Sequence, residues 1–440
     1  MIVDDNESIS YEQLFLEVEM LARHLKRSWS LKGGEHVAII CKNNVSSIKA
    51  IFACTRLGLH VYLLNPKIGK LQWQSLLNEF RYDFILYDSN FPHPIPTSAL
   101  MLDHLVVNSD ENIEIPRTST GNIHLFTAGT TGKAKVLTHT PSLFTYLPVL
   151  FTVIWRLKLC RYRTAYVATP ICHSYGFAML LVFLVLGKNI VLSETFRSEL
   201  IERHRVEVIT VVPFLIEKLL ETVPHQLASL RCIASGSAEL RPATVEKVFR
   251  KFGPILFNLY GTSEAGLTTI ATPDDLTYSP STIGKKVSGI RIQIRNVQPG
   301  EIGKLYVYRG KQWIDTGDLS YQDDRGYYFL YGRIDDMVNV RGINVYPVEL
   351  EDVLTKHPNV KQAAVIGSKE KLIAYVQLEP GAHIRKDDLS GWLKERVATY
   401  QLPSSIQFVD QLPYTNVGKL DKKKLYRETK EGSTWKEKRH

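Results

Sequence analysis

The alternation of helical patterns with short apolar runs over residues 1–330 is the feature that most constrains the fold. Apolar side chains at helical spacing over Glu12–Arg27 precede the apolar run His36–Ile40, and the same alternation continues beyond it. Runs such as Val208–Val212 are almost entirely apolar, which is typical of strands buried on both faces of a parallel sheet. Because strands that alternate with helices form such sheets, the sequence predicts an α/β fold.

The periodicity changes to two over Ile290–Tyr331, where apolar and polar residues alternate between Gly and Asp turns. This pattern predicts a small antiparallel β subdomain. The remaining chain reads helix, strand, strand, helix, strand, and its second helix is predicted over Lys386–Tyr400. We therefore predict a large N-terminal domain, residues 1–334 with its β subdomain at about 285–334, and a small α+β C-terminal domain, residues 335–440.

The five cysteines lie far apart, and no two of them form a Cys-x-x-Cys pair. They are Cys41, Cys54, Cys160, Cys172 and Cys232. Such a set argues against a disulfide framework or a zinc site and favours a reducing compartment. No signal-peptide pattern opens the chain, and the longest apolar run, Phe177–Leu186, is too short to span a bilayer. We expect a cytoplasmic protein without a transmembrane segment.

The formal net charge is +9, and Lys419–His440 contain nine basic and four acidic residues. The basic character is therefore partly a property of the C-terminal segment, which is either a solvated tail or a surface for phosphate or a membrane. Peripheral membrane contact thus stays open. The chain lacks basic motifs interleaved with aromatic residues, so no nucleic-acid partner is expected.

The densest group of residues suited to bind phosphate lies between Leu125 and Lys135, after a short apolar strand. Glycines let backbone amides approach an anion, threonine hydroxyls add donors, and lysines bring positive charge. Ala134 stands where a Walker A loop has Ser or Thr, so this is a phosphate loop of another type. Its residues are Thr127, Gly129, Thr130, Thr131, Gly132, Lys133 and Lys135.

This loop resembles that of the adenylate-forming (AMP-binding) superfamily, which includes acyl-CoA synthetases, aryl-CoA ligases, adenylation domains of peptide synthetases and luciferases. Further signatures of the family occur in order along the chain, from about Tyr11 to about Leu425. The resemblance implies a large N-terminal domain and a small mobile C-terminal domain that pivots at Asp335. It also implies Mg²⁺ as cofactor, with ATP and coenzyme A as substrates.

The segment Asn258–Glu264 resembles the family's Tyr-Gly-x-Thr-Glu signature. The resemblance implies that Tyr260 stacks on the base, that Ser263 contacts a phosphate and that Glu264 holds Mg²⁺. Asp318 matches the Asp of the family's Thr-Gly-Asp signature, which accepts hydrogen bonds from the ribose hydroxyls. The further residues implied to bind nucleotide are Gly236, Ser237, Ala238, Asn258, Gly261 and Arg333.

The segment Pro413–Lys419 resembles the family's Pro-x-Thr-x-x-Gly-Lys element, which brings a lysine to the reacting carboxylate and the α-phosphate. A lysine there places compact positive charge where negative charge accumulates in the transition state. His173 lies in a Pro-x-x-His-x-x-Gly pattern, and the family places this His between the nucleotide and the acyl pocket. Arg341 and Gly342, after the hinge, would lie beside the pantetheine arm. The implied catalytic residues are Lys419, His173 and Glu264.

The resemblance implies activation of a carboxylic acid to an acyl-adenylate with release of pyrophosphate, then transfer to the thiol of coenzyme A. We favour a fatty acid, although the apolar stretches Leu143–Trp155 and Phe177–Leu186 could line an alkyl tunnel or equally belong to the core. Aryl acids such as succinylbenzoate stay open, as do amino and hydroxy acids. An amino acid is disfavoured because the region directly after Val208 supplies no obvious Asp to bind its amino group.

Two other functions remain possible with the same motifs. An acyl-AMP ligase would load a carrier protein in place of coenzyme A. A non-catalytic nucleotide-binding relative would keep the fold but lose the catalytic charges, all of which this chain retains.

The sequence departs from the family pattern at a few places. Ala134 replaces the usual Pro, Val136 the usual Gly, and Asn339 the usual Lys after the hinge. A segment that many relatives carry is missing between Gly310 and Trp313. These changes bear on substrate geometry and rate more than on the chemistry, because every charged position of the motifs is retained.

Overall fold

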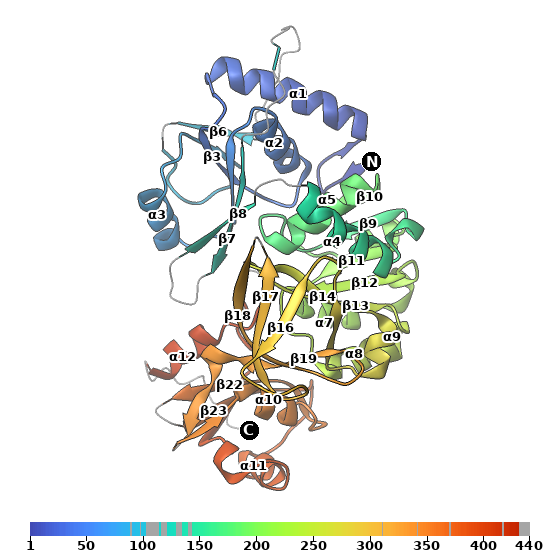
Figure 1. Ribbon diagram of the computed structural model, residues 1–440, viewed down its shortest axis with the longest axis vertical. Coiled ribbons are helices and arrows are strands. Elements are labelled where there is room, and N and C mark those ends of the chain that lie inside the picture. The colour runs from blue at the N-terminus through green and yellow to red at the C-terminus, as the bar shows by residue number, and fades with distance from the viewer. Residues whose placement is uncertain are drawn as a thin grey trace. The chain divides into compact units, whose positions relative to one another are not determined.

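The computed structural model comprises two compact units, which are described separately (Figure 1). Unit 1 is Met1–Val211 with Glu221–Ala234, and unit 2 is Val212–Leu220 with Ser235–His440. The structure describes residues 1–88, 90–96, 98–102, 114–115, 121–128, 134–139, 143–309, 311–340, 342–368, 371–415 and 418–430.

Unit 1 contains a six-stranded sheet of order β6-β5-β3-β4-β7-β8, in which the first five strands are parallel and the last is antiparallel. The strands are β3 (His36–Ile40), β4 (His60–Leu64), β5 (Phe84–Tyr87), β6 (Ala99–Met101), β7 (Ile123–Ala128) and β8 (Ala134–His139). The helices are α1 (Tyr11–Ser28), α2 (Val45–Arg56) and α3 (Lys70–Glu79). Trp73 and Leu76 of α3 pack on Ala38 and Tyr62, so α3 covers one face of the sheet.

Local signals explain where these helices begin. Ser10 caps α1 through a capping box with Gln13, and the Asn44 side chain accepts a hydrogen bond from Ser47 N at the start of α2. Such caps satisfy amide groups that have no partner inside the helix. The predicted alternation of helices and parallel strands is therefore present in unit 1.

The second sheet of unit 1 has the order β12-β11-β9-β10-β1-β2, in which β11, β9, β10 and β1 are parallel. The strands are β1 (Ile2–Val3), β2 (Ser8–Ile9), β9 (Thr164–Val167), β10 (Asn189–Leu192), β11 (Val208–Val211) and β12 (Cys232–Gly236). The helices are α4 (Leu143–Arg156), α5 (Ser174–Val185) and α6 (Glu199–Arg203), with short turns η2 (Leu159–Arg161) and η3 (Pro224–Leu227). All residues of β9 and β11 are buried, as their apolar runs predict.

Unit 2 contains an antiparallel sheet of order β13-β14-β15-β19-β18-β17-β16. The strands are β13 (Leu256–Thr262), β14 (Gly266–Ala271), β15 (Thr282–Lys286), β16 (Arg291–Arg295), β17 (Gly303–Arg309), β18 (Gln312–Gln322) and β19 (Tyr328–Arg333). The helices are α7 (Pro213–Glu221), α8 (Pro242–Phe252) and α9 (Pro273–Tyr278). The antiparallel subdomain predicted from the period-two pattern corresponds to β16–β19.

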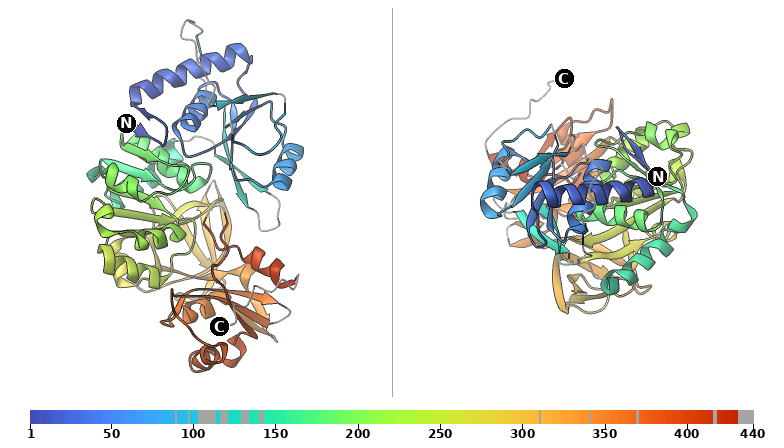
Figure 2. Two further views of the ribbon diagram at one scale, coloured as in Figure 1. Left: turned by 180° about the vertical axis from the view of Figure 1, so that it is seen from behind. Right: turned by 90° about the horizontal axis from the view of Figure 1, so that it is seen from above.

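The C-terminal part of unit 2 has a three-stranded sheet of order β22-β23-β24 and a separate β20–β21 hairpin. Figure 2 shows its strands and helices from behind, in orange and red. The strands are β20 (Val338–Val340), β21 (Ile343–Val345), β22 (Val360–Ser368), β23 (Lys371–Leu378) and β24 (Ser405–Phe408). The helices are α10 (Pro347–Leu354), α11 (Lys386–Lys394) and α12 (Lys422–Lys430), with turns η4 (Ile334–Asp336) and η5 (Thr399–Gln401). Together the two units confirm the predicted α/β class with a small β subdomain and an α+β C-terminal part.

One predicted helix is too long. The helix expected over Lys386–Tyr400 ends at Lys394, after which Arg396 and Val397 both donate to the carbonyl of Leu393 and turn the chain. Val397 still packs against the C-terminal core without being helical. The apolar side chain that suggested a continuous helix is therefore packed against the core by this turn.

Of the helices in the described ranges, none combines the length and the apolar character that crossing a membrane requires. The most apolar stretch foreseen from the sequence is α5, whose buried residues include Phe177, Leu180 and Phe183. It is a core helix of unit 1.

Candidate active site

Three residues from separate sequence motifs meet in unit 2. Tyr260 lies on β13, while Asp318 and Arg333 are directly opposite each other on the paired strands β18 and β19. The Tyr260 hydroxyl donates to Asp318 Oδ2 at 2.6 Å, and Arg333 Nη1 donates to Asp318 Oδ1 at 3.1 Å. Each oxygen of the Asp318 carboxylate thus accepts one hydrogen bond, and each can accept another from a further hydroxyl.

The local sequence around Asp318 fixes the position of its carboxylate. The Thr316 hydroxyl accepts from Asp318 N at 3.2 Å and donates to Leu305 O at 2.9 Å, which ties β18 to β17. Gly317 has φ +74°, and a Cβ there would lie 2.7 Å from Arg333 Nη2. The Thr-Gly-Asp order therefore anchors the strand, makes the left-handed turn and leaves room for the guanidinium group.

The charges of these residues interact with those of two more motifs. Burial raises the pKa of Asp318, which is 7% exposed, while the Tyr260 hydrogen bond and the charges of Arg333 and Lys419 lower it. Desolvation and the charge of Arg333 lower the pKa of Lys419, although part of its side chain reaches solvent, and the carboxylates of Asp318 and Glu264 act in the opposite sense. Four charged residues from four motifs thus lie within electrostatic reach of one another.

Lys419 is presented by a tight turn. Thr415 N donates to Lys419 O at 2.7 Å, and Lys419 N donates to the Thr415 hydroxyl at 3.1 Å. Gly418 has φ +74°, and a Cβ there would lie 2.6 Å from Cγ2 of Val212, so a side chain is disfavoured at this position for two reasons. In the part of the chain that the structure describes, no carboxylate forms an ion pair with Lys419 Nζ.

Glu264 lies in the connection between β13 and β14. Gly261 is required there because a Cβ would lie 2.4 Å from the carbonyl oxygen of Gly266. Arg309 Nη1 donates to the carbonyl of Ala265 at 2.5 Å and so holds the residue next to Glu264. The sequence motifs do not include Arg309, because its partner lies 44 positions away along the chain.

The residues present fit a magnesium ion of the kind that accompanies a nucleotide. Within the described ranges, no three His, Cys, Asp or Glu side chains converge to form a cage for a metal. Mg²⁺ is usually bound through one or two carboxylates, substrate phosphates and water, and it does not need such a cage. Glu264, the one protein ligand that the sequence predicts, matches that chemistry.

The predicted adenine loop follows β12 in unit 2. Ser237 has φ +68°, a left-handed conformation that costs a residue with a side chain about 1–3 kcal/mol. Asn258 is buried on β13, two residues before Tyr260. Gly236 is the last residue of β12, and Ala238 follows the strained position.

His173 lies in unit 1 at the N-cap position of α5, where its side chain makes no hydrogen bond to the first turn of the helix. Asn65 Nδ2 is 3.3 Å from His173 Nε2, and Asn65 Oδ1 accepts from Lys67 N at 2.8 Å. Because the Lys67 amide identifies the oxygen, the amide nitrogen of Asn65 is the donor and Nε2 of His173 accepts. Gly176 allows α5 to begin here, because a Cβ there would lie 2.3 Å from Pro170 O.

A second asparagine holds the segment that leads to His173. The buried Asn43 donates to the carbonyls of Val167 and Thr169 at 3.2 and 3.0 Å and accepts from Ile171 N at 2.8 Å. Sequence reasoning missed Asn43 and Asn65, because their partners are more than 100 positions away. The only signal near Asn65 was the Asn-Pro pair, which indicates the end of a strand.

Several predicted site residues lie outside the described ranges. Gly129, Thr130, Thr131, Gly132, Lys133 and Arg341 belong to this group. Thr127 and Lys135 are backbone partners near the ends of β7 and β8, which pair antiparallel, and β7 is the short apolar strand predicted before the loop.

The segment after the hinge is a second hairpin. Gly342 has φ +89° at its turn and donates to Asn339 Oδ1 at 2.8 Å, which gives the unusual Asn339 a structural role. Asp335 lies in η4, and Arg333 Nη2 contacts its carboxylate at 3.4 Å.

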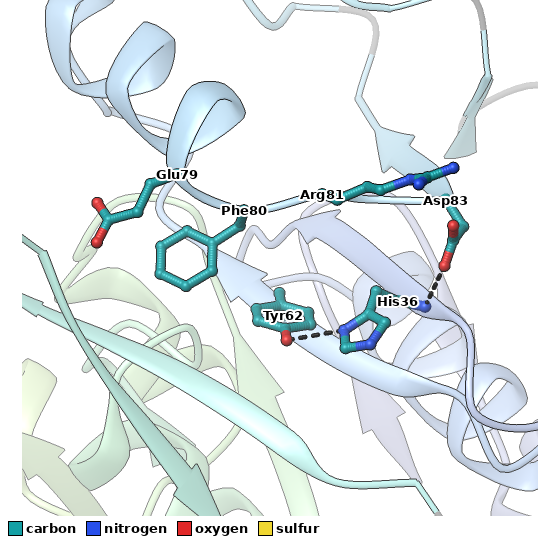
Figure 3. Close-up of a pocket in the computed structure, with 6 residues that line it drawn as sticks. All are labelled: His36, Tyr62, Glu79, Phe80, Arg81 and Asp83. Atoms are coloured by element: carbon teal, nitrogen blue, oxygen red, sulfur yellow. Dashed lines mark hydrogen bonds between the residues drawn. The ribbon is translucent and has the colours of Figure 1, made fainter.

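A hollow of 380 Å³ in unit 1 is lined by none of the predicted site residues (Figure 3). Its lining residues are His36, Tyr62, Glu79, Phe80, Arg81 and Asp83. His36 is held there by a hydrogen bond of its Nδ1 with the Tyr62 hydroxyl at 2.8 Å and by donation from its backbone N to Asp83 Oδ2 at 2.9 Å. Because His36, Tyr62 and Asp83 already bond to one another, we assign this hollow no role in the reaction.

The two apolar helices considered for an acyl tunnel differ in burial. Six residues of α5 are buried in unit 1. On α4, by contrast, Phe151 and Trp155 are 64% and 79% exposed. These two aromatic side chains therefore do not line an enclosed tunnel.

The comparisons with known proteins cover both ends of this chain. The AMP-binding enzyme family matches residues 1–313, and its C-terminal domain matches residues 349–419. The 2-succinylbenzoate–CoA ligase of Bacillus licheniformis is 28% identical, with 96% of each chain covered. That of Staphylococcus aureus strain Newman is 25% identical, with 97% of this chain and 96% of the relative covered.

Solved structures agree with these matches. The o-succinylbenzoate CoA synthetase of Bacillus subtilis in complex with its acyl-adenylate intermediate is 26% identical, with a TM-score of 0.84 over 96% of this chain and 94% of that one. ATP-bound MatB from Rhodopseudomonas palustris, at 23% identity and a TM-score of 0.86 over 98% and 96% of the two chains, supports the fold alone. The 2-succinylbenzoate–CoA ligases described above are acid–CoA ligases, and the chain belongs to the AMP-binding enzyme family.

Proposed function

We propose that this protein is an AMP-forming acid–CoA ligase and that its acid is an aryl keto dicarboxylate of the 2-succinylbenzoate type. The observation that carries the first part is the convergence of Tyr260, Asp318, Arg333 and Lys419 with Glu264 nearby. The second part is supported by relatives that match over nearly the whole length of both chains and are named 2-succinylbenzoate–CoA ligases.

In the first step a carboxylate oxygen of the acid attacks the α-phosphorus of ATP, and the bond from that phosphorus to the pyrophosphate oxygen breaks. Asp318 would accept the ribose hydroxyls, with Arg333 and Tyr260 holding its carboxylate in place. Lys419 would offset the negative charge that builds up between the carboxylate and the phosphate. A magnesium ion, when bound at Glu264, supplies charge neutralisation on the phosphates.

The surroundings of Lys419 suit an anionic substrate. Partial desolvation and the charge of the Arg333 guanidinium group both lower the pKa of the Lys419 amine, although the residue is exposed. A cation without an ion-pair partner of its own binds an incoming anion without first breaking a salt bridge. The reacting carboxylate and the α-phosphate would form the ion pair with the Lys419 amine.

In the second step the thiolate of coenzyme A attacks the carbonyl carbon of the acyl-adenylate, and the carbon–oxygen bond to AMP breaks, so that AMP leaves with the bridging oxygen. Lys419 has no task in this step, because the phosphate leaves as a stable monoester. We propose that residues 335–440 turn about Asp335 between the two steps and bring Arg341 and Gly342 to the pantetheine arm. The boundary between 334 and 335 and the cytoplasmic location remain predictions.

A fatty acid was the first preference from the sequence, but none of the named ligases among the relatives described above is specific for one. 2-Succinylbenzoate differs from a fatty acid in having an aromatic ring, a ketone and a second carboxylate. An enzyme adapted to it needs a polar partner for the second carboxylate, since leaving a charge unpaired in a pocket is costly.

The deciding experiment measures pyrophosphate release with and without coenzyme A. The acids are 2-succinylbenzoate, benzoylpropionate (which lacks the ring carboxylate), benzoate, and a series of fatty acids. We expect 2-succinylbenzoate to have the highest kcat/KM and benzoylpropionate to lose much of it. Higher kcat/KM with any fatty acid would refute the proposed substrate class but leave the ligase chemistry intact.

The same assay addresses the two alternatives. Transfer to a phosphopantetheinyl carrier protein in preference to coenzyme A would indicate a carrier-loading acyl-AMP ligase. No pyrophosphate release with any acid would indicate a non-catalytic relative, against which the retained charges of Glu264, Asp318, Arg333 and Lys419 argue.

A further inference from the structure

Helix α4 presents two large aromatic side chains to solvent. Phe151 and Trp155 are 64% and 79% exposed and lie four residues apart, so they share one face of the helix. Thr152 and Val153, on another face, are buried and hold the helix in unit 1. An exposed Trp next to an exposed Phe is unusual on a protein surface that contacts only water.

A run of basic residues follows these aromatic side chains directly. Between Arg156 and Arg163 the chain contains four basic residues and no acidic one. Lys158 and Arg161 are exposed, and neither forms an ion pair with a carboxylate within the described ranges. The positive charges of Lys158 and Arg161 are therefore available to a partner.

Backbone hydrogen bonds keep the basic run close to the aromatic pair. Lys158 N donates to Trp155 O at 3.1 Å, and Arg161 N donates to Lys158 O at 3.0 Å. The left-handed conformation of Lys158, with φ 54°, turns the chain from α4 into η2. Aromatic anchors and basic side chains thus belong to one compact segment, residues 151–163, which we call the α4–η2 surface.

We propose that the α4–η2 surface binds the surface of an anionic phospholipid bilayer. Trp and Phe side chains favour the interface between headgroups and acyl chains, and Lys and Arg favour anionic headgroups. A second copy of this chain fits less well, because a two-fold interface through this surface would bring the two basic runs together. The proposal is independent of the identity of the acid.

The test is co-sedimentation of the full-length protein with vesicles of phosphatidylcholine alone or of phosphatidylcholine with phosphatidylglycerol. We expect binding to the anionic vesicles only, weakened by added salt. Each basic side chain near an anionic membrane contributes about fivefold in binding constant, so Lys158→Gln with Arg161→Gln should weaken binding by roughly 25-fold. Phe151→Ser with Trp155→Ser should also remove most of the binding to anionic vesicles.

The controls are matched in chemistry and lie on other elements. Leu71→Ser removes an apolar side chain of α3 that is 82% exposed, and Lys32→Gln with Lys394→Gln removes two exposed charges elsewhere. These variants should bind the anionic vesicles as the unchanged protein does. Equal binding by all variants, or no binding by the unchanged protein, would overturn the proposal.

Cys160 offers an independent measurement. It is the one exposed cysteine of the five and lies within the α4–η2 surface, so an environment-sensitive fluorophore can be attached there selectively. Its emission should shift to the blue on addition of anionic vesicles. If sedimentation velocity instead shows a dimer that Phe151→Ser with Trp155→Ser dissociates, and no shift occurs, the surface is a self-interface and the lipid proposal is wrong.

Discussion

Replacement of Lys419 by Ala separates the two steps of the proposed reaction. Preorganised groups that face developing negative charge each contribute about 10²–10³ in rate, or about 3–4 kcal/mol. Lys419 should lie at the upper end of this range, because among the described residues its amine has no carboxylate partner to neutralise it before substrate binds. We therefore expect carboxylate-dependent ATP–pyrophosphate exchange to fall by about a thousandfold.

The second step should be almost unaffected by this substitution. The assay supplies preformed acyl-adenylate and measures thioester formation with coenzyme A, so the adenylation step is bypassed. Equal losses in both assays would contradict the role assigned to Lys419. Lys424→Ala is the matched control. The Lys424 side chain is 53% exposed, and its amine lies 4.0 Å from the Glu428 carboxylate, a surface ion pair that contributes little to stability.

The stability of the variant distinguishes loss of chemistry from loss of fold. The folded state lowers the pKa of Lys419, so the unfolded chain binds that proton more tightly and the charged amine opposes folding at neutral pH, below both pKa values. The Lys419→Ala variant should therefore unfold at the same or a higher temperature. In the unchanged enzyme, adenylation should decline as the pH rises toward the lowered pKa, below the usual 10.5.

Three further substitutions test the contacts around the site. Asp318→Asn should raise the KM for ATP by about 10- to 100-fold, since hydrogen bonds to a charged group contribute about 1.5–3 kcal/mol, and titration of ATP at saturating acid measures it. Gly176→Ala should destabilise the protein in urea by about 1–3 kcal/mol, because the new Cβ would lie 2.3 Å from Pro170 O; an unchanged midpoint would refute the contact. Arg241→Met removes the partner at 3.1 Å from the buried Glu351 but leaves Lys422 at 2.9 Å and the Val365 amide at 2.8 Å, so it should lower the free energy of unfolding by about 1.5–3 kcal/mol, the contribution of one hydrogen bond to a charged group; no loss would show that Lys422 alone compensates that carboxylate.

The sequence alone was sufficient for most of the elements and for the candidate residues of the nucleotide site. Hydrophobic periodicity is a local property, and it predicted β3 with the bounds that the structure has, and α1 to within a residue at each end. The motif residues were also identifiable, because the turns that carry them need particular residues locally. Gly317 and Gly418, for example, have positive φ, which glycine adopts without strain.

Tertiary structure decided what no local pattern contains. Asn43, Asn65 and Arg309 act on segments 44 or more positions away, and nothing in their own neighbourhood marks those partners. Burial was equally out of reach, since α4 and α5 are both rich in apolar residues, yet α4 exposes Trp155 while α5 is largely core. Periodicity records which residues share a face of an element, but only the packing of distant parts of the chain determines whether that face meets protein or solvent.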